Sequence, residues 1–342
     1  MKAYLRDHIS SLTAYTSARD EFNDLRDQVF LDANENPYEN NYNRYPDPYQ
    51  RDLKDKIAAF RNWNTDNLFL GNGSDEILDL LFRCFVEPGK EEVLTVKPSY
   101  GMYSVLAKFQ GIELKEFGLE SDFSLDEKAF IEEINPNTKM LILCNPNNPT
   151  ASVFNTSFLE NTIAQFNGIV VIDEAYIDFS KTKSMADLVD KFDNLVVVQT
   201  LSKAVGLAGL RVGMAYTNKE LVGVLNSVKA PYNISSVAQR AAIGVLEDTQ
   251  KIQNQIQELL DQREWVANEL ASMEKIEKVY PSETNFILFQ VRNASLYYKE
   301  LIQKGIVVRD RSKTYACDSC LRVSIGTPEE NKRFIKTLKE LL

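Results

Sequence analysis

The sequence contains a single histidine, His8, and this scarcity excludes several kinds of catalysis. Ser-His-Asp and Cys-His mechanisms need an imidazole base beside the nucleophile, and His8 is remote in sequence from every other polar motif. Cys317 and Cys320 have the spacing of half a zinc or redox site, but no second cysteine pair exists. We therefore predict no metal, and proton transfer must use another kind of side chain.

Long apolar runs and a basic excess are also missing. No run approaches the roughly 20 apolar residues of a membrane span, and the first residues lack a signal-peptide core. The 39 basic and 49 acidic side chains give a net charge of -10, which argues against binding to nucleic acids or anionic membranes. We therefore expect a cytoplasmic protein that acts on small molecules.

What the chain does contain is a reactive stretch after a buried strand. Residues 195–198 are continuously apolar and β-branched, so they predict a buried strand whose carboxyl end carries Thr200, Ser202 and Lys203. Open α/β sheets hold their ligands at this end of the strands. Lys203 there suits Schiff-base chemistry with an aldehyde, and Thr200, Ser202 and Arg211 suit a phosphate. An ordinary surface lysine beside a turn is the alternative.

Four further segments end predicted strands in polar or aromatic residues. Tyr100 follows the strand at 92–96, Asn148 the one at 140–144, and Asp173 and Tyr176 the one at 168–172. The strand at 68–70 runs into Gly71-Asn72-Gly73-Ser74-Asp75, where free N–H groups at a helix start make an anion site. Helix capping alone would also explain the last two residues of that run.

Pyridoxal 5'-phosphate (PLP) satisfies all of these strand ends together. Its aldehyde would take Lys203, its ring nitrogen Asp173, its phenolic oxygen Asn148 and Tyr176, and its ring would stack on Tyr100. Its phosphate would take two half-sites, composed of Ser74, Asp75, Thr200, Ser202 and Arg211. The predicted catalytic residues are Lys203, as cofactor anchor and general base, with Asp173 and Tyr176.

In these motifs the chain resembles the histidinol-phosphate aminotransferases, within the fold-type-I family of PLP-dependent aminotransferases. The resemblance covers essentially the whole chain and is carried by segments in a fixed order: 34–37 (NENP), 43–46 (NRYP), 71–76 (GNGSDE), 98–103 (PSYGMY), 146–150 (PNNPT), 173–176 (DEAY), 202–211 and 321–327 (LRVSIGT). The family usually has glycine after the Asn-Pro-Thr, where this chain has Ala151. If that position needs φ above zero, alanine strains it by roughly 1 kcal/mol.

The resemblance implies a homodimer in which Tyr45 reaches the phosphate of the partner's cofactor. It also implies that Arg322 binds the substrate carboxylate, that Tyr15 and Arg309 help to bind the substrate phosphate, and that Asn34 belongs to the substrate site. Solvated strand faces are the alternative for both arginines.

The predicted fold class is α/β. We predict an N-terminal arm at 1–29, a large domain at 30–235 and a small α+β domain at 236–342. The large domain has a mixed but mostly parallel sheet flanked by helices, and part of the arm joins the small domain. In detail we expect an edge strand at 211–216, one long helical region from 236 to 272, and strands at 285–289, 306–309 and 321–325 separated by helices.

The activity implied by the resemblance is a ping-pong transamination in histidine biosynthesis. It exchanges glutamate and imidazole-acetol phosphate for 2-oxoglutarate and histidinol phosphate. Two rivals share the cofactor residues: an aromatic amino acid aminotransferase and a threonine-phosphate decarboxylase. A non-catalytic PLP-binding protein is a third alternative, although such a protein would have no need of Lys203 together with Asp173 and the phosphate clamp.

Overall fold

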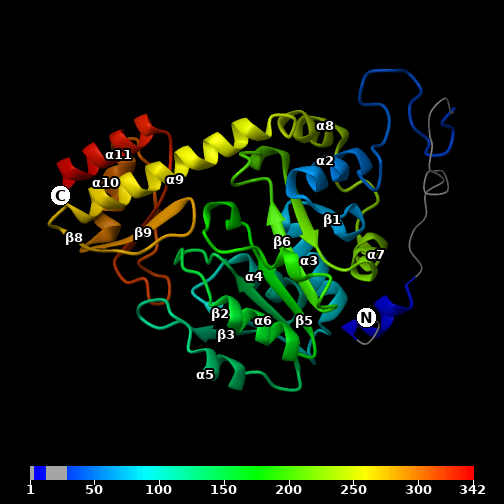
Figure 1. The fold of residues 1–342 in the computed structure, drawn as a ribbon, viewed down its shortest axis with the longest axis horizontal. Helices are drawn as coiled ribbons and strands as arrows, with labels where there is room; N and C mark the ends of the chain where they lie inside the picture. The colour runs from blue at the N-terminus through cyan, green and yellow to red at the C-terminus, as the bar shows by residue number, and fades with distance from the viewer. Residues whose placement is uncertain (1–3, 13–28) are drawn as a thin grey trace.

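The protein is described by a computed structural model that covers residues 4–12 and 29–342 (Figure 1). Two sheets organise it, and the long helix α9 (Thr249–Ala271) runs from one to the other. Within these residues no helix has the length and apolar character needed to cross a membrane.

The larger sheet has seven strands in the order β1-β7-β6-β5-β4-β2-β3. Neighbouring pairs are parallel from β3 to β6, whereas β7 is antiparallel to both β1 and β6. The strands are β1 (Leu68–Asn72), β2 (Glu92–Lys97), β3 (Glu113–Gly118), β4 (Thr138–Cys144), β5 (Ile169–Asp173), β6 (Leu195–Thr200) and β7 (Val212–Tyr216). The predicted mixed, mostly parallel sheet is confirmed.

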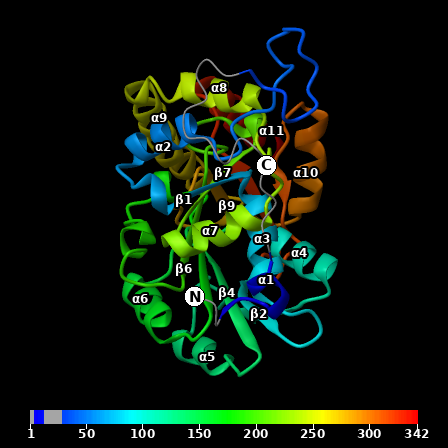
Figure 2. The same cartoon turned by 90° about the vertical axis from the view of Figure 1, so that its right-hand side faces the viewer.

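Alternate strand residues enter different cores because successive side chains point to opposite faces of a sheet. On β5, Val170 and Ile172 face one core, while Ile169 and Val171 face the other. Figure 2 shows strands β4 and β6 between α6 on one side and α3 and α4 on the other. The helices around this sheet are α2 (Arg51–Arg61), α3 (Ser74–Phe85), α4 (Met102–Gln110), α5 (Glu127–Glu132), α6 (Thr156–Gln165), α7 (Lys219–Val228) and α8 (Ser236–Val245).

The smaller sheet is wholly antiparallel, in the order β10-β11-β9-β8. Its strands are β8 (Ile276–Val279), β9 (Phe286–Val291), β10 (Arg309–Asp310) and β11 (Cys320–Ser324). Side chains of α9, α10 (Ala294–Gln303) and α11 (Pro328–Leu341) form its core with β9 and β11. This sheet agrees with the predicted α+β unit; the residue limits of the domains stay predictions.

Three predicted details are wrong. Residues 212–216 do not form an edge strand, because β1 pairs with them on the outer side. The helical region at 236–272 is two helices, since the Asp248 side chain caps a new helix by accepting from Lys251 N. The strand expected at 306–309 is reduced to Arg309–Asp310, and turns rather than a helix join it to β11.

Candidate active site

Five strand ends and the start of a sixth strand meet at one edge of the large sheet. Strands β1, β2, β4, β5 and β6 run in the same direction, so their carboxyl ends share this edge, and the antiparallel β7 begins there, next to Arg211. A hollow at this edge is lined by Ser74, Asp75, Tyr100, Cys144, Asn148, Asp173, Ala175, Tyr176, Thr200, Ser202, Lys203 and Arg211. Every residue predicted to bind the cofactor lines it, except Tyr45.

Lys203 follows β6 and reaches into this hollow. Its Nζ lies 5.7 Å from the ring centroid of Tyr176. Loss of solvent around the ammonium lowers the pKa of Lys203, and the positive charge of Arg322 lowers this pKa further. A larger fraction of the amine is therefore neutral near pH 7 than for an exposed lysine, as a nucleophile or general base requires.

Asp173 ends β5 and is buried, with 3% of its surface exposed. Its Oδ2 accepts a hydrogen bond of 2.7 Å from Tyr103 Oη, and its Oδ1 accepts one of 3.2 Å from Ala175 N. Burial raises the pKa of Asp173, whereas the bond from Tyr103 lowers it. Such a carboxylate suits a cationic partner such as a protonated ring nitrogen.

The two predicted anion half-sites lie side by side. Gly73 caps α3 with φ +78°, and a Cβ there would come within 2.5 Å of Arg211 Nη2. On β7, a Cβ on Gly213 would come within 2.4 Å of Ser74 N. Glycine at both positions therefore lets the start of α3 approach Ser202 and Arg211, whose Oγ and Nη1 are 3.5 Å apart. N–H groups at a helix start, a hydroxyl and a guanidinium in one cradle suit a phosphate.

Arg211 also pairs with Asp75 at 3.2 Å, in a contact that is roughly half exposed. Ion pairs of this kind are worth at most about 1 kcal/mol, so a phosphate can draw the guanidinium away at little cost. Together with Lys203 and Asp173, the donor set therefore fits PLP.

The aromatic and amide groups come from neighbouring loops. Tyr100 Oη donates to Asp75 Oδ1 at 3.0 Å. Asn147 ties two loops together, because its Nδ2 donates to Pro98 O at 2.9 Å and its Oδ1 accepts from Ser99 Oγ. The loop holding Asn148 then turns at Ala151, where φ is +60°. The condition for strain at this alanine, a positive φ, is therefore met.

Arg322 of the small sheet lies beside this loop, and two further arginines lie near it in the chain or in the sheet. Arg322 Nη1 donates to Asn148 Oδ1, and its guanidinium is 4.9 Å from the ring centroid of Phe286. In the register of the sheet, Arg309 lies directly opposite Arg322. Burial, and the charge of Arg311 next to it, lower the pKa of Arg322 to about 10. None of these three guanidinium groups has a carboxylate partner within the described residues.

Arg311 and Tyr103 were missed by the sequence analysis. The Nε of Arg311 is buried without a hydrogen-bond partner in the described part of the chain, as is the neighbouring Ser312 Oγ. The alternation Arg309-Asp310-Arg311 was the available signal, because residues i and i+2 of an extended segment share a face. For Tyr103 the signal was its place three residues after Tyr100, at the start of a helix.

Of the predicted residues that the structure describes, Asn34, Tyr45, Arg309 and Arg322 do not line the hollow. Tyr15 lies outside the described residues. Tyr45 is 50% exposed and stacks on Tyr232 with 4.4 Å between ring centroids. Asn34 has φ +53° and does not line the hollow. Their roles stay predictions.

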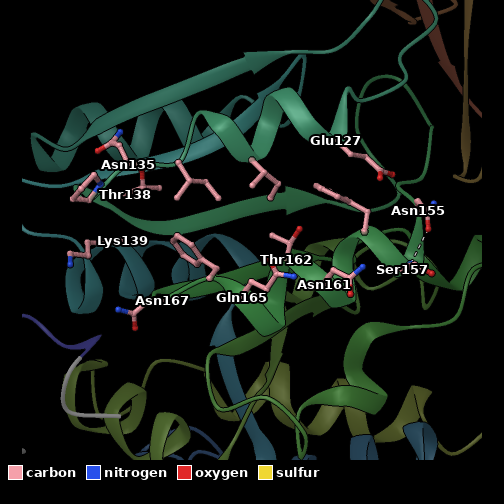
Figure 3. A pocket seen from close by; sticks show the side chains of 15 residues that line it. Glu127, Asn135, Thr138, Lys139, Asn155, Ser157, Asn161, Thr162, Gln165 and Asn167 are labelled. Atoms are coloured by element: carbon pink, nitrogen blue, oxygen red, sulfur yellow. Dashed lines mark hydrogen bonds between the residues drawn. The ribbon is translucent and has the colours of Figure 1, made fainter.

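Two other features carry no comparable chemistry. A hollow of about 650 Å³ between α5 and α6 has an apolar floor and a rim of amides, with Glu127 and Lys139 among its polar residues (Figure 3). Cys317 and Cys320 are buried, and burial raises the pKa of their thiols to about 12 and about 11. Both thiols are therefore protonated and unreactive near neutral pH.

Comparison with known proteins gives consistent matches. Residues 18–338 match the family model described as aminotransferase class I and II. Proteins named histidinol-phosphate aminotransferase from Flavobacterium johnsoniae and Parabacteroides distasonis are 46% and 44% identical, over 98% and 100% of this chain and 97% and 99% of their own. The crystal structure of the histidinol-phosphate aminotransferase from Clostridium acetobutylicum superposes with a TM-score of 0.79 at 27% identity, covering 88% of this chain and 91% of that one.

Proposed function

Because the chain belongs to the family of class I and II aminotransferases, we propose that it transfers the amino group between glutamate and imidazole-acetol phosphate, giving histidinol phosphate. The observation that carries this assignment is the identity of 41–46% with proteins of that name over nearly the whole chain. The cofactor of the family is PLP, and the cradle described above fits it. The reaction is a step of histidine biosynthesis.

When bound, PLP supplies an aldehyde for the lysine and a cationic ring that accepts the electron pair left at the substrate Cα. Asp173 would keep the ring nitrogen protonated, and Ser74, Ser202 and Arg211 would hold the phosphate. Lys203 Nζ would take the Cα proton of the substrate and pass it to the C4' carbon of the cofactor, because the lowered pKa of Lys203 favours the neutral amine.

The small-sheet arginines select the substrate. Arg309 and Arg322 lie opposite each other on adjacent strands. Two positive charges in this position repel each other unless an anion binds between them. A phosphate dianion relieves this repulsion more than a single carboxylate does. We therefore assign the substrate phosphate to Arg309 and Arg322 with Tyr15, and the carboxylate of glutamate to Arg322 alone.

The partner of the chain is a second copy of itself. Apolar side chains are exposed along residues 29–45 and on α8, at Val29, Leu31, Tyr38, Tyr42, Tyr45, Val237 and Val245. An exposed apolar surface of this kind favours association. In this dimer we place Tyr45 at the cofactor phosphate of the other subunit, and light scattering should give twice the mass of the chain. A cytoplasmic location stays a prediction from the sequence.

The test is a half-reaction on the purified, PLP-loaded protein. Histidinol phosphate should convert the visible absorbance of the bound cofactor rapidly, whereas phenylalanine and threonine phosphate should do so much more slowly. If only an aromatic amino acid converts the absorbance, the proposed substrate is wrong and the proposed cofactor is still supported. A protein that acquires no visible band with PLP would overturn the whole proposal.

A further inference from the structure

Tyr103 lies in the first turn of α4, and no function described so far uses it. Its side chain is among the largest that are fully buried in the molecule, with 1% of its surface exposed. Its ring meets that of Tyr100 edge-on, with 5.6 Å between centroids and 86° between planes. It belongs to the core that covers one face of the large sheet, so its packing alone would justify a phenylalanine.

The phenol hydroxyl is directed at the carboxylate of Asp173, 70 positions later in the chain, across 2.7 Å. No water is needed to bridge the two groups, and both are almost completely buried. Hydrogen bonds to an ionised acceptor are about twice as strong as neutral ones, and more so away from solvent. Only one oxygen of the carboxylate receives this bond; the other accepts from Ala175 N.

The hydroxyl changes how basic the carboxylate is. A donor hydrogen-bonded to the charged form stabilises that form, so the bond from Tyr103 opposes the effect of burial on Asp173. Burial also raises the pKa of Tyr103 well above its usual value, so Tyr103 stays a donor at every working pH. Without the hydroxyl, Asp173 would compete more strongly for any proton that it shares with a partner.

We propose that Tyr103 is a positioning residue that holds the Asp173 carboxylate ionised and fixed, so that the proton shared between Asp173 and the cofactor ring stays on the ring nitrogen. This inference rests on the proposed function, because it takes PLP as the partner of Asp173. The step is a displacement of one proton along one hydrogen bond, from Asp173 Oδ toward the ring nitrogen, with no other reactant. Tyr103 touches neither cofactor nor substrate in this role.

The experiment loads the protein with PLP labelled with 15N in the ring and measures the ring-nitrogen chemical shift, which reports its protonation directly. Tyr103→Phe keeps the ring and removes the hydroxyl. The 15N chemical shift of the cofactor ring in Tyr103→Phe should move from the wild-type value toward the value in Asp173→Ala. The second variant is the reference for a cofactor ring that has no carboxylate partner. Turnover should fall by about ten- to a hundredfold, the loss expected for a hydrogen bond to a charged group, with little change in KM.

Tyr216→Phe is the matched control. Tyr216 is also fully buried, on β7, and its Oη lies 3.7 Å from Met214 Sδ, so this variant removes a buried phenol hydroxyl away from the cradle. It should keep the wild-type chemical shift and turnover. A change in Tyr216→Phe equal to that in Tyr103→Phe would overturn the inference, because it would make the effect one of general stability.

A second substitution keeps the proposal testable if the Tyr103→Phe variant does not fold. Replacing Tyr103 by 3,5-difluorotyrosine keeps the shape and gives a stronger donor, so the ring nitrogen should become more protonated than in the wild type. An unchanged chemical shift in this protein, or in Tyr103→Phe, would refute the proposal. The shift is recorded before any amino acid is added, so an error in the proposed substrate leaves this result intact.

Discussion

Replacing Arg309 by glutamine should weaken catalysis and strengthen the fold at the same time. Arg309 is exposed and lies opposite Arg322 in the antiparallel pair of β10 and β11. Like charges directly opposite in a sheet are destabilising by about 0.2–1 kcal/mol, and solvent screening at the exposed Arg309 places this pair in the lower part of that range. We therefore expect the apo protein to gain a few tenths of a kcal/mol, or about 0.5 °C in melting temperature.

The loss in catalysis follows from the charge on the substrate. A hydrogen bond between charged groups contributes about 1.5–3 kcal/mol, so kcat/KM for histidinol phosphate should fall by about ten- to a hundredfold. Glutamate offers its α-carboxylate to Arg322 and should lose less than about threefold. The assay is the half-reaction with each amino donor, followed by the absorbance of the bound cofactor, together with calorimetry of the apo protein at two salt concentrations.

Arg292→Gln is the control, because Arg292 is an exposed arginine in the turn after β9 that pairs with Glu277 of β8 and lies outside the site. It should change neither donor's kinetics. Equal losses for glutamate and histidinol phosphate in Arg309→Gln would refute the assignment of Arg309 to the phosphate. A loss of stability in that variant would refute the cross-strand repulsion, as would a gain that is unaffected by high salt.

Three further outcomes follow from the same geometry. Arg211→Gln should raise the Kd for PLP by about ten- to a hundredfold in a fluorescence titration while barely moving the apo melting temperature, because the pair with Asp75 is half exposed. Arg322→Gln should raise the pKa of Lys203, because it removes a positive charge that lowers this pKa. The rate at which the apo protein captures PLP should therefore increase at a higher pH than in the wild type. A stopped-flow pH profile that does not shift would contradict this coupling. Burial raises the pKa of Glu174 from 4.5 to about 7, so the folded state binds this proton more tightly than the unfolded chain does. The free energy of unfolding should therefore fall as the pH rises from 4.5 to 7. Urea melts of Glu174→Gln should show a smaller fall over the same pH range.

Much of the cofactor cradle was predictable because it depends on local order along the chain. Each buried strand contains a short apolar run, and the residues after it fall at the carboxyl edge once the strands are parallel. Lys203 and Asp173 could therefore be placed together although 30 positions separate them. The prediction needed only the direction of each strand and not its neighbours.

Features that depend on distant partners could not be predicted in this way. The position of β7 inside the sheet is set by its pairing with β1, more than 130 residues earlier. The edge strand β3 was missed because its residues are half exposed and show no apolar alternation. The bond from Tyr103 to Asp173 joins α4 to β5 and has no signature in either segment alone.

The hydrogen bond between Arg322 and Asn148 links the two sheets at the candidate site. Arg322 belongs to β11 of the small sheet, whereas Asn148 follows β4 of the large one and is assigned to the cofactor's phenolic oxygen. Arg322 Nη1 donates to this amide, whereas its Nε is buried without a hydrogen-bond partner in the described part of the chain. Because a guanidinium has five N–H donors, a substrate anion could bind at Nε while the bond to Asn148 is kept. The predicted substrate residue and the predicted cofactor residue would then act through one guanidinium, which links recognition of the substrate to the position of the amide.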